Sequence, residues 1–274
     1  MVPTFADRLN ARVEGPSGAR PVVFAHGFGC DQTMWRHVAP RFTDDYRTVL
    51  FDFVGAGGSD PEAYDPERYA TLEGYAADLA GLVEELDLRD AVVVGHSVSS
   101  MIAALAHVAV PERITGLVMV APNPRYINDG GYFGGFSREE IDGMISALAA
   151  NYEAWAAAIA PTIVGNPNRP ELGQELTDVF CRMDPEIALR FARATFLSDT
   201  RDVLPRITAP TLVLQCRKDA IAPTSVGAYV AAKVREAKLV MMQASGHTPN
   251  LSAPRETAAE IEAFLASLGS LSAA

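Results

Sequence analysis

Short, unbroken apolar runs recur along this chain and constrain its fold more than any other feature. They are PVVFA (21–25), TVLFDF (48–53), AVVVG (91–95), GLVMVA (116–121), TLVLQC (211–216) and KLVMMQ (238–243). Runs that lack polar and apolar alternation are typical of parallel strands covered by helices on both faces. The segments between them, such as 71–86, and the last segment, 254–268, have helical periodicity. The sequence therefore predicts an α/β fold with a mostly parallel, doubly wound sheet.

Between Ala121 and about Pro205 the strand-like runs stop, and four helical segments take their place. The first segment follows a capping box at 137–140 and the second covers 151–160. The third covers 171–181 and the fourth 185–197, and a proline stands at the start of each of these two. Such an insertion lies over the carboxyl ends of the strands, where open α/β sheets bind ligands. We therefore predict one domain with an inserted helical lid, the core being 1–122 and 205–274 and the lid 123–204.

The charge and the cysteines of the chain argue against several partners. The 274 residues carry 23 Lys and Arg against 34 Asp and Glu, a formal net charge of −11. Such a chain repels phosphate backbones and anionic lipid surfaces, so we expect neither nucleic acid nor a membrane as partner. The three cysteines contain no CxxC pair, and the start of the chain has no apolar stretch of signal-peptide length. We therefore expect a cytoplasmic protein without a disulfide framework or a structural zinc site.

The strongest local motif is GHSVS (95–99), where a strand-like run breaks at Ser97 and passes into a good helix former. A strand, a sharp turn and a helix in this order match the nucleophile elbow of serine hydrolases, which lifts the serine hydroxyl above the sheet. The first turn of the helix directs its partial positive charge at the same point. Ser99 stands where the GxSxG pattern has its second glycine, so the motif alone also fits an ordinary strand-to-helix turn.

A serine nucleophile needs a base, and the base needs an acid that orients it. Asp219 follows the run TLVLQC and His247 follows KLVMMQ, so each lies just past the end of a predicted strand. The chain order Ser, Asp, His is that of the α/β hydrolases. Taken alone, the position of Asp219 is equally compatible with a turn residue or with an ion-pair partner of Lys218. The position of His247 is equally compatible with a histidine in a surface loop. Together with the elbow, these positions predict a catalytic triad of Ser97, Asp219 and His247.

An acyl-transfer site also needs two backbone N–H groups that hold a negatively charged oxygen. Val98, directly after the nucleophile, supplies one, and we assign the other to Phe28 in the glycine-rich HGFG (26–29). The segment 54–60 lacks the third glycine of a dinucleotide site, and the chain has neither GxxxxGK[ST] nor HExxH. We therefore expect no cofactor and no metal.

Five stretches considered as a set resemble one group of proteins. They are HGFGCDQTMW (26–35), GHSVSSM (95–101), VMVAPNPRYIND (118–129), FLSDTRD (196–202) and LQCRKDAIAP (214–223). The chain resembles the RsbQ-type α/β hydrolases, a bacterial stress-signalling group to which the plant strigolactone and karrikin receptors are related. This resemblance extends over nearly the whole chain, and the serine at the fifth elbow position is similar to the plant receptors' version. It implies the same triad, the same two oxyanion donors, and a four-helix lid over an apolar pocket.

The resemblance also implies a pocket lined by aromatic side chains. The expected lining residues are Trp155, Phe191 and Phe196 on the lid helices and Tyr126 and Phe136 at the entrance of the lid. Each of them also fits core packing, because lid helices bury one face against the body. Such a pocket favours a small, hydrophobic, uncharged ester or lactone.

Two functions follow from these observations. The first is a serine hydrolase that acts on a small hydrophobic carbonyl compound within or outside stress signalling. The alternative is a ligand-sensing signalling protein with slow or incidental hydrolysis, whose lid docks a partner such as a stress-pathway phosphatase. The partner is implied by the resemblance alone.

Overall fold

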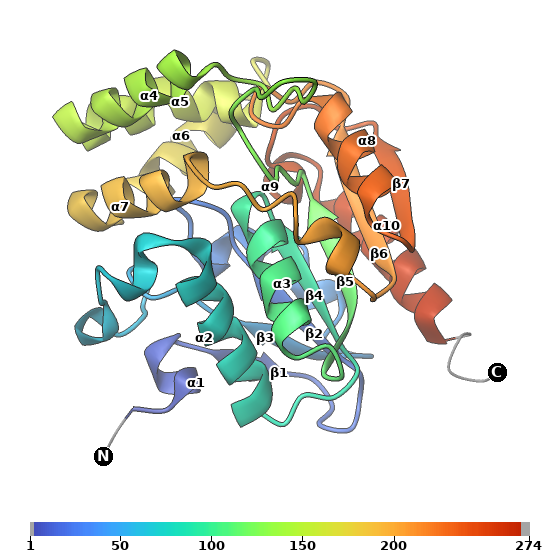
Figure 1. The fold of residues 1–274 in the computed structure, drawn as a ribbon. Coiled ribbons are helices and arrows are strands. Elements are labelled where there is room, and N and C mark those ends of the chain that lie inside the picture. Colours follow the sequence, from blue (N-terminus) through green and yellow to red (C-terminus); the bar gives the residue numbers. More distant parts are fainter. Residues whose placement is uncertain (1–2, 270–274) are drawn as a thin grey trace.

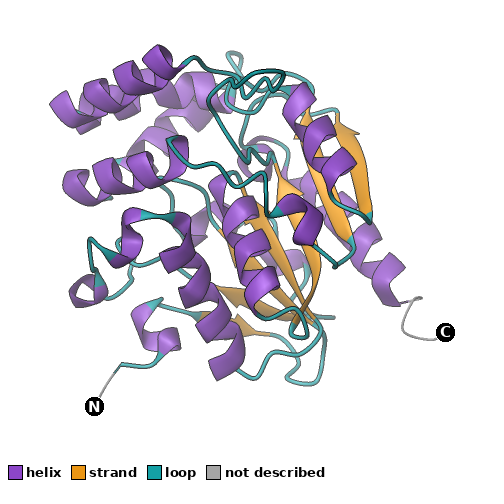
Figure 2. Ribbon diagram, viewed as in Figure 1, coloured by secondary structure: helices purple, strands orange, loops and turns teal. Residues whose placement is uncertain are grey.

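A seven-stranded sheet forms the centre of the computed structural model, which describes residues 3–269. Its strands lie in the order β1-β3-β2-β4-β5-β6-β7; β1 is antiparallel to β3, and the other neighbours are parallel. The strands are β1 (Arg12–Glu14), β2 (Pro21–Ala25), β3 (Arg47–Leu50), β4 (Ala91–His96), β5 (Ile114–Val120), β6 (Thr211–Cys216) and β7 (Ala237–Met242). Helices lie on both sides of the sheet (Figure 2). The predicted α/β architecture with a mostly parallel sheet is confirmed.

Both faces of the central strands are buried, which explains why their sequences lack alternation. In β2, Val23 belongs to a hydrophobic cluster with residues of α2 (Leu72–Glu85) and α3 (Val98–Ala109). The next residue, Phe24, belongs to a second cluster with residues of α10 (Pro254–Gly269). Because successive strand residues point to opposite faces, a strand covered on both sides is apolar at every position.

The remaining elements of the body are short, except for α8. They are α1 (Phe5–Arg8), α8 (Thr224–Lys233), α9 (Pro249–Ser252) and the 3-10 turns η1 (Gln32–Trp35), η2 (Ala39–Arg41), η3 (Pro61–Ala63), η4 (Arg68–Ala70) and η5 (Leu204–Arg206). Across residues 3–269, no helix has the length and apolar character that a membrane crossing needs.

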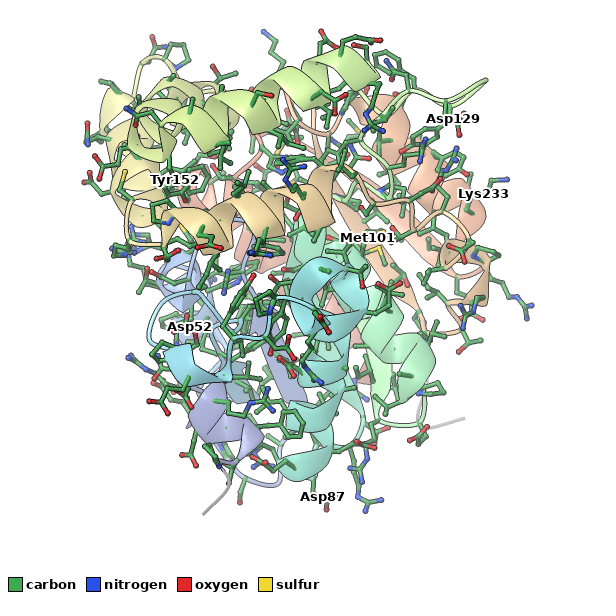
Figure 3. All side chains as sticks on the ribbon, turned by 60° about the vertical axis from the view of Figure 1, so that its left-hand side comes forward. Asp52, Asp87, Met101, Asp129, Tyr152 and Lys233 are labelled. Carbon is green, nitrogen blue, oxygen red and sulfur yellow. The ribbon has the colours of Figure 1, made fainter. Side chains whose placement is uncertain are left out.

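Four helices lie between β5 and β6 in the chain: α4 (Arg138–Ala150), α5 (Tyr152–Val164), α6 (Pro170–Phe180) and α7 (Pro185–Phe196). Figure 1 shows them stacked above the carboxyl ends of the strands, and Figure 3 shows Tyr152 among the side chains of this layer, with Asp52 in the body below it. The capping box at the start of α4 is present, since Ser137 and Glu140 each bond the backbone of the other. We call these helices the insertion.

Two boundaries differ by three residues or more from the predictions, and one strand was not predicted. Helix α5 does not end at 160 but continues through Pro161 to Val164, where Gly165 terminates it in a left-handed conformation. Strand β3 ends at Leu50 and not at 53, because the chain leaves the sheet and the buried carboxylate of Asp52 accepts backbone hydrogen bonds from Gln32 and Gly58. Strand β1 has no counterpart among the predicted runs, because its three residues are exposed and carry no apolar pattern.

Candidate active site

The turn between β4 and α3 holds Ser97 in a strained backbone conformation. Its φ of 57° and ψ of −124° lie in a region that non-glycine residues rarely adopt. Gly95 permits the turn, because a Cβ at this position would lie 2.3 Å from the carbonyl oxygen of Ser99. Helix α3 begins at Val98, so the serine lies at the amino end of a buried helix. The local geometry is that of a strand-turn-helix elbow.

Ser99, the residue that departs from the GxSxG pattern, has a defined contact in this elbow. Its hydroxyl donates a hydrogen bond to the backbone carbonyl of His26, in the loop that follows β2. A glycine at position 99 would leave that buried carbonyl without this donor. The serine therefore ties the elbow to the neighbouring loop, which carries Phe28.

Folding brings together the three side chains predicted to form a triad. Ser97 Oγ lies 2.7 Å from His247 Nε2, and His247 Nδ1 lies 2.8 Å from Asp219 Oδ2 and 3.1 Å from Asp219 Oδ1. Ser97 and His247 are buried. The chain thus supplies an unbroken hydrogen-bonded series from a hydroxyl through an imidazole to a carboxylate.

The environment of Asp219 keeps its carboxylate charged although it is buried. Burial raises the pKa of this carboxyl, but His247 and the backbone N–H groups of Ile221 and Ala222 outweigh that effect and hold the pKa below its ordinary value. A carboxylate accepts the proton of His247 Nδ1–H, which leaves the lone pair of Nε2 facing Ser97. In this tautomer the imidazole can take the proton of the serine hydroxyl.

The loop that carries His247 is seated on the end of α5. The N–H of His247 donates to the carbonyl of Ile163 at 2.8 Å. Gly246 has a φ of 88°, and a Cβ there would lie 1.8 Å from the carbonyl oxygen of Val164. Only glycine fits at position 246, and this close contact with the end of α5 means that the insertion helps to position His247.

The loop after β2 places Phe28 between the elbow and the insertion. The N–H groups of Phe28 and Val98 have no hydrogen-bond partner within residues 3–269. The ring of Phe28 lies 5.6 Å from that of Phe196 and 6.1 Å from that of Trp155, centroid to centroid. This loop therefore offers a free backbone donor on one side and an aromatic surface on the other.

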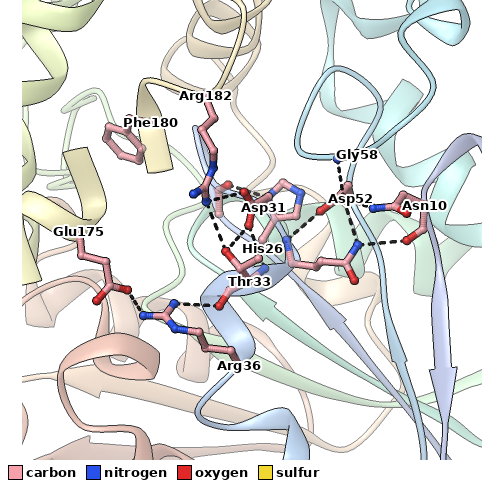
Figure 4. Close-up of polar contacts among 12 residues, drawn as sticks. Asn10, His26, Asp31, Thr33, Arg36, Asp52, Gly58, Glu175, Phe180 and Arg182 are labelled. Atoms are coloured by element: carbon pink, nitrogen blue, oxygen red, sulfur yellow. Dashed lines mark hydrogen bonds and ion pairs between the residues drawn. The ribbon is translucent and has the colours of Figure 1, made fainter. Parts of the chain in front are cut away.

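A network of polar contacts fixes this loop to the body and to the insertion (Figure 4). His26 Nε2 accepts a hydrogen bond from the N–H of Phe53 at 3.1 Å, and Asp52 accepts from the N–H of Gln32 at 2.8 Å. On the insertion side, Arg182 forms an ion pair with Asp31 at 2.7 Å. His26 thus bonds the main chain of the body.

An apolar cavity lies above the three side chains, between the body and the insertion. Its empty space is about 490 Å³, including the opening towards solvent. Among the predicted pocket residues, Trp155, Phe196 and Tyr126 line it, and so does Phe28. Burial raises the pKa of the Tyr126 hydroxyl to about 12, although the nearby Ser97 acts in the opposite direction, so this hydroxyl is a neutral donor. The side chains that can accept or donate protons lie at the base of an otherwise apolar space.

Two predicted pocket residues, Phe191 and Phe136, are not among the side chains that line this cavity. Phe191 is buried; its ring stacks on that of Tyr75 at 4.5 Å and lies 5.5 Å from that of Phe28, centroid to centroid. Phe136 belongs to a turn that folds back on Tyr126, to whose carbonyl its N–H donates at 3.1 Å. Phe136 itself is partly buried against the hydrophobic core.

Several lining residues were not predicted. They come from the apolar faces of the insertion helices and from loops at the strand ends: Met144, Ile159, Ile163, Leu176, Phe180 and Thr195, and Cys30, His96, Ile221 and Thr248. The spacing of Ile159 and Ile163 places both on one side of α5, but spacing does not tell which neighbour that side faces. Within residues 3–269, no group of three or more His, Cys, Asp or Glu side chains could hold a metal ion.

Burial holds His96 in its neutral form and predicts acid sensitivity of the fold. Burial, with His247 nearby, lowers the pKa of His96 to about 3, against about 6.5 in an unfolded chain. Below pH 6.5 the unfolded state therefore binds a proton that the folded state does not, so stability falls as the pH falls. From pH 6.5 to pH 5 we expect His96 to lower the free energy of unfolding by about 2 kcal/mol.

Urea unfolding between pH 7 and pH 5 measures this loss. A His96→Gln variant should show a pH slope smaller by about one proton, because glutamine does not titrate. An unchanged slope would contradict the assignment of His96 as a neutral buried residue.

The comparisons with known proteins agree with this geometry. Residues 22–260 match the family model described as "Alpha/beta hydrolase family". The chain is 41% identical over 246 residues to the Karrikin insensitive 2 receptor CA of Petunia hybrida, covering 89% of this chain and 91% of the relative. It is 40% identical over 253 residues to the Strigolactone esterase D14 of Arabidopsis thaliana, covering 92% and 94%. A solved hydrolase from Oleispira antarctica superposes with a TM-score of 0.92 at 38% identity, covering 95% of each chain. The chain therefore belongs to the α/β hydrolase family.

Proposed function

We propose that this enzyme hydrolyses a small, uncharged, apolar ester or lactone through an acyl-enzyme formed on Ser97. The observation that carries the proposal is the hydrogen-bonded series Ser97–His247–Asp219 at the base of an apolar cavity. The cavity is lined mainly by apolar and aromatic side chains from the insertion and the body, as small-molecule sites are. Its lining has no charge to pair with an ionic substrate, so an uncharged substrate fits it best.

Each side chain has one role in this mechanism. Ser97 Oγ attacks the carbonyl carbon while His247 Nε2 takes the hydroxyl proton, and the charged Asp219 stabilises the imidazolium that forms. The free N–H groups of Phe28 and Val98 hold the oxyanion. His247 then gives its proton to the leaving oxygen, and water, activated by the same histidine, releases the acyl group from Ser97.

We further propose that α4–α7 act as a lid over the site. The insertion supplies Trp155 and Phe196 to the cavity wall and anchors the backbone of His247. In this proposal residues 123–204 form the lid, and residues 1–122 and 205–274 form the catalytic body. Three unpaired cysteines fit a reducing compartment such as the cytoplasm, where we place this activity.

An active-site probe tests the catalytic proposal directly. Incubation with a fluorophosphonate should add one probe mass to the protein, and peptide mass spectrometry should locate it on Ser97, because the probe reacts with activated serines. Denatured protein is the control, since it keeps the serine but loses His247 and the oxyanion donors. An unlabelled native protein, or equal ester hydrolysis by Ser97→Ala, would contradict the proposal.

A second candidate function is ligand sensing, and the observation that favours it is the similarity to the Karrikin insensitive 2 receptor CA. In this alternative, which the resemblance to RsbQ-type regulators also implies, hydrolysis is slow and the lid surface docks a partner such as a signalling phosphatase. A pull-down with the Ser97→Ala variant, loaded with a small lactone, distinguishes the two. A partner retained only with the ligand supports sensing, whereas rapid turnover of the lactone without a retained partner supports the enzyme.

A further inference from the structure

His96 contacts three separate parts of the proposed site. It is the last residue of β4 and directly precedes Ser97. Its Nε2 lies 2.8 Å from the carbonyl oxygen of His247. On the other side of the ring, a Cβ placed on Gly27, next to Phe28, would lie 2.7 Å from His96 Nδ1. One buried imidazole therefore packs against the nucleophile, the base and the oxyanion loop.

The hydrogen bond to His247 defines the tautomer of His96. A neutral imidazole has one N–H donor and one acceptor nitrogen, and a carbonyl oxygen only accepts. The proton must therefore be on Nε2, and Nδ1 is left as an acceptor without a partner among the residues described. A neutral ring also places no positive charge beside His247 when that residue takes up a proton.

Both backbone groups of His247 are held, each by a different part of the molecule. Its N–H donates to Ile163 of the insertion, and its carbonyl accepts from His96 of the sheet. The first contact follows the position of α5, whereas the second comes from β4, the strand that ends directly before Ser97. The His96 contact therefore fixes the distance between base and nucleophile within the body of the protein.

We propose that His96 is a positioning residue, whose Nε2–H fixes the carbonyl of His247 and so keeps His247 Nε2 within hydrogen-bond reach of Ser97 Oγ. The inference rests on the proposed function and adds a fourth side chain to its machinery. Its physical basis is that catalysis by a bound base depends steeply on placement, and a displacement of about 1 Å can cost on the order of 100-fold in rate.

Two substitutions of similar length separate positioning from packing. In His96→Gln the amide nitrogen reaches about as far as Nε2 and can donate, whereas His96→Met fills the space without a donor. We expect the second-order rate constant of fluorophosphonate labelling to fall about 10- to 100-fold in His96→Met. His96→Gln should remain within about threefold of the unsubstituted protein, because the hydrogen bond is kept. With p-nitrophenyl acetate as substrate, the loss should appear in kcat and not in KM.

His107→Met is the matched control. His107 is also a buried histidine that bonds a backbone carbonyl, that of Ile114 at 2.8 Å, but it lies on α3 outside the cavity lining. This substitution should lower the thermal midpoint and leave the labelling rate unchanged. A fall in the labelling rate as large as that of His96→Met would show that general destabilisation is the cause and would overturn the inference.

The remaining outcomes are equally decisive. Labelling of His96→Met at the unsubstituted rate, or equal rates for the Gln and Met variants with equal thermal midpoints, would overturn the inference while leaving Ser97 labelling intact. If His96→Met does not fold, His96→Asn replaces it, because asparagine is polar but too short to reach the carbonyl. Absence of labelling in the unsubstituted protein would instead contradict the proposed function, and the inference that rests on it.

Discussion

Replacing Asp219 with asparagine should lower kcat on a small ester about 10⁴-fold and leave the fold intact. The two hydrogen bonds from Ile221 N–H and Ala222 N–H can be retained, because the asparagine carbonyl accepts as the carboxylate oxygen does. The other position becomes an NH₂ group that donates to His247 Nδ1. The proton of the imidazole then moves to Nε2, which faces Ser97 and can no longer accept from it. The substitution thus reverses the hydrogen-bond direction without removing a contact.

Steady-state hydrolysis of p-nitrophenyl acetate, with circular dichroism to confirm folding, measures this effect. Asp184→Asn is a suitable control, because Asp184 also accepts two backbone N–H groups, at the start of α7, but contacts no histidine. Its activity should be unchanged, since asparagine caps helices as well as aspartate does. Loss of less than tenfold in Asp219→Asn would show that Asp219 does not orient the base.

A Gly95→Ala substitution should lower the free energy of unfolding by about 3 kcal/mol or more, or prevent folding. Its Cβ would lie 2.3 Å from the carbonyl oxygen of Ser99 and 2.7 Å from the nitrogen of Ser100. These are main-chain atoms of a buried helix, so no side-chain rotation relieves the overlap. The turn would have to open, and the surrounding close-packed core resists such a movement.

Urea unfolding followed by fluorescence gives the free energy, and Gly143→Ala gives the comparison. Gly143 lies within α4, and a Cβ there would have no atom within 4 Å. Alanine should stabilise that helix by up to about 1 kcal/mol, because it loses less backbone entropy on folding. A Gly95→Ala variant with the unsubstituted urea midpoint would mean that the elbow is not closed as the structure shows it.

The fold was predictable from sequence because its signal is local. The runs at 21–25 and 211–216 coincide with β2 and β6, since a strand covered on both faces must be apolar at every position. Pro161 and Asp52 were harder to interpret. The helix tolerates Pro161 in its interior, and Asp52 accepts from the N–H of Gln32 in another loop as well as from that of Gly58 in its own, a contact that no local pattern reveals.

The sequence by itself determined the strand runs and the elbow at Ser97, because each depends on residues that are neighbours in the chain. The order in which Asp219 and His247 follow Ser97 is likewise part of the sequence. Only the tertiary structure decided which aromatic rings meet the cavity. Phe196 lines it while Phe191, five residues earlier on the same helix, stacks on Tyr75. Helical spacing defines an apolar face but not its partner, which depends on how separate elements pack. For the same reason, the contact between His96 and the carbonyl of His247, 151 residues apart, is visible only in the folded chain.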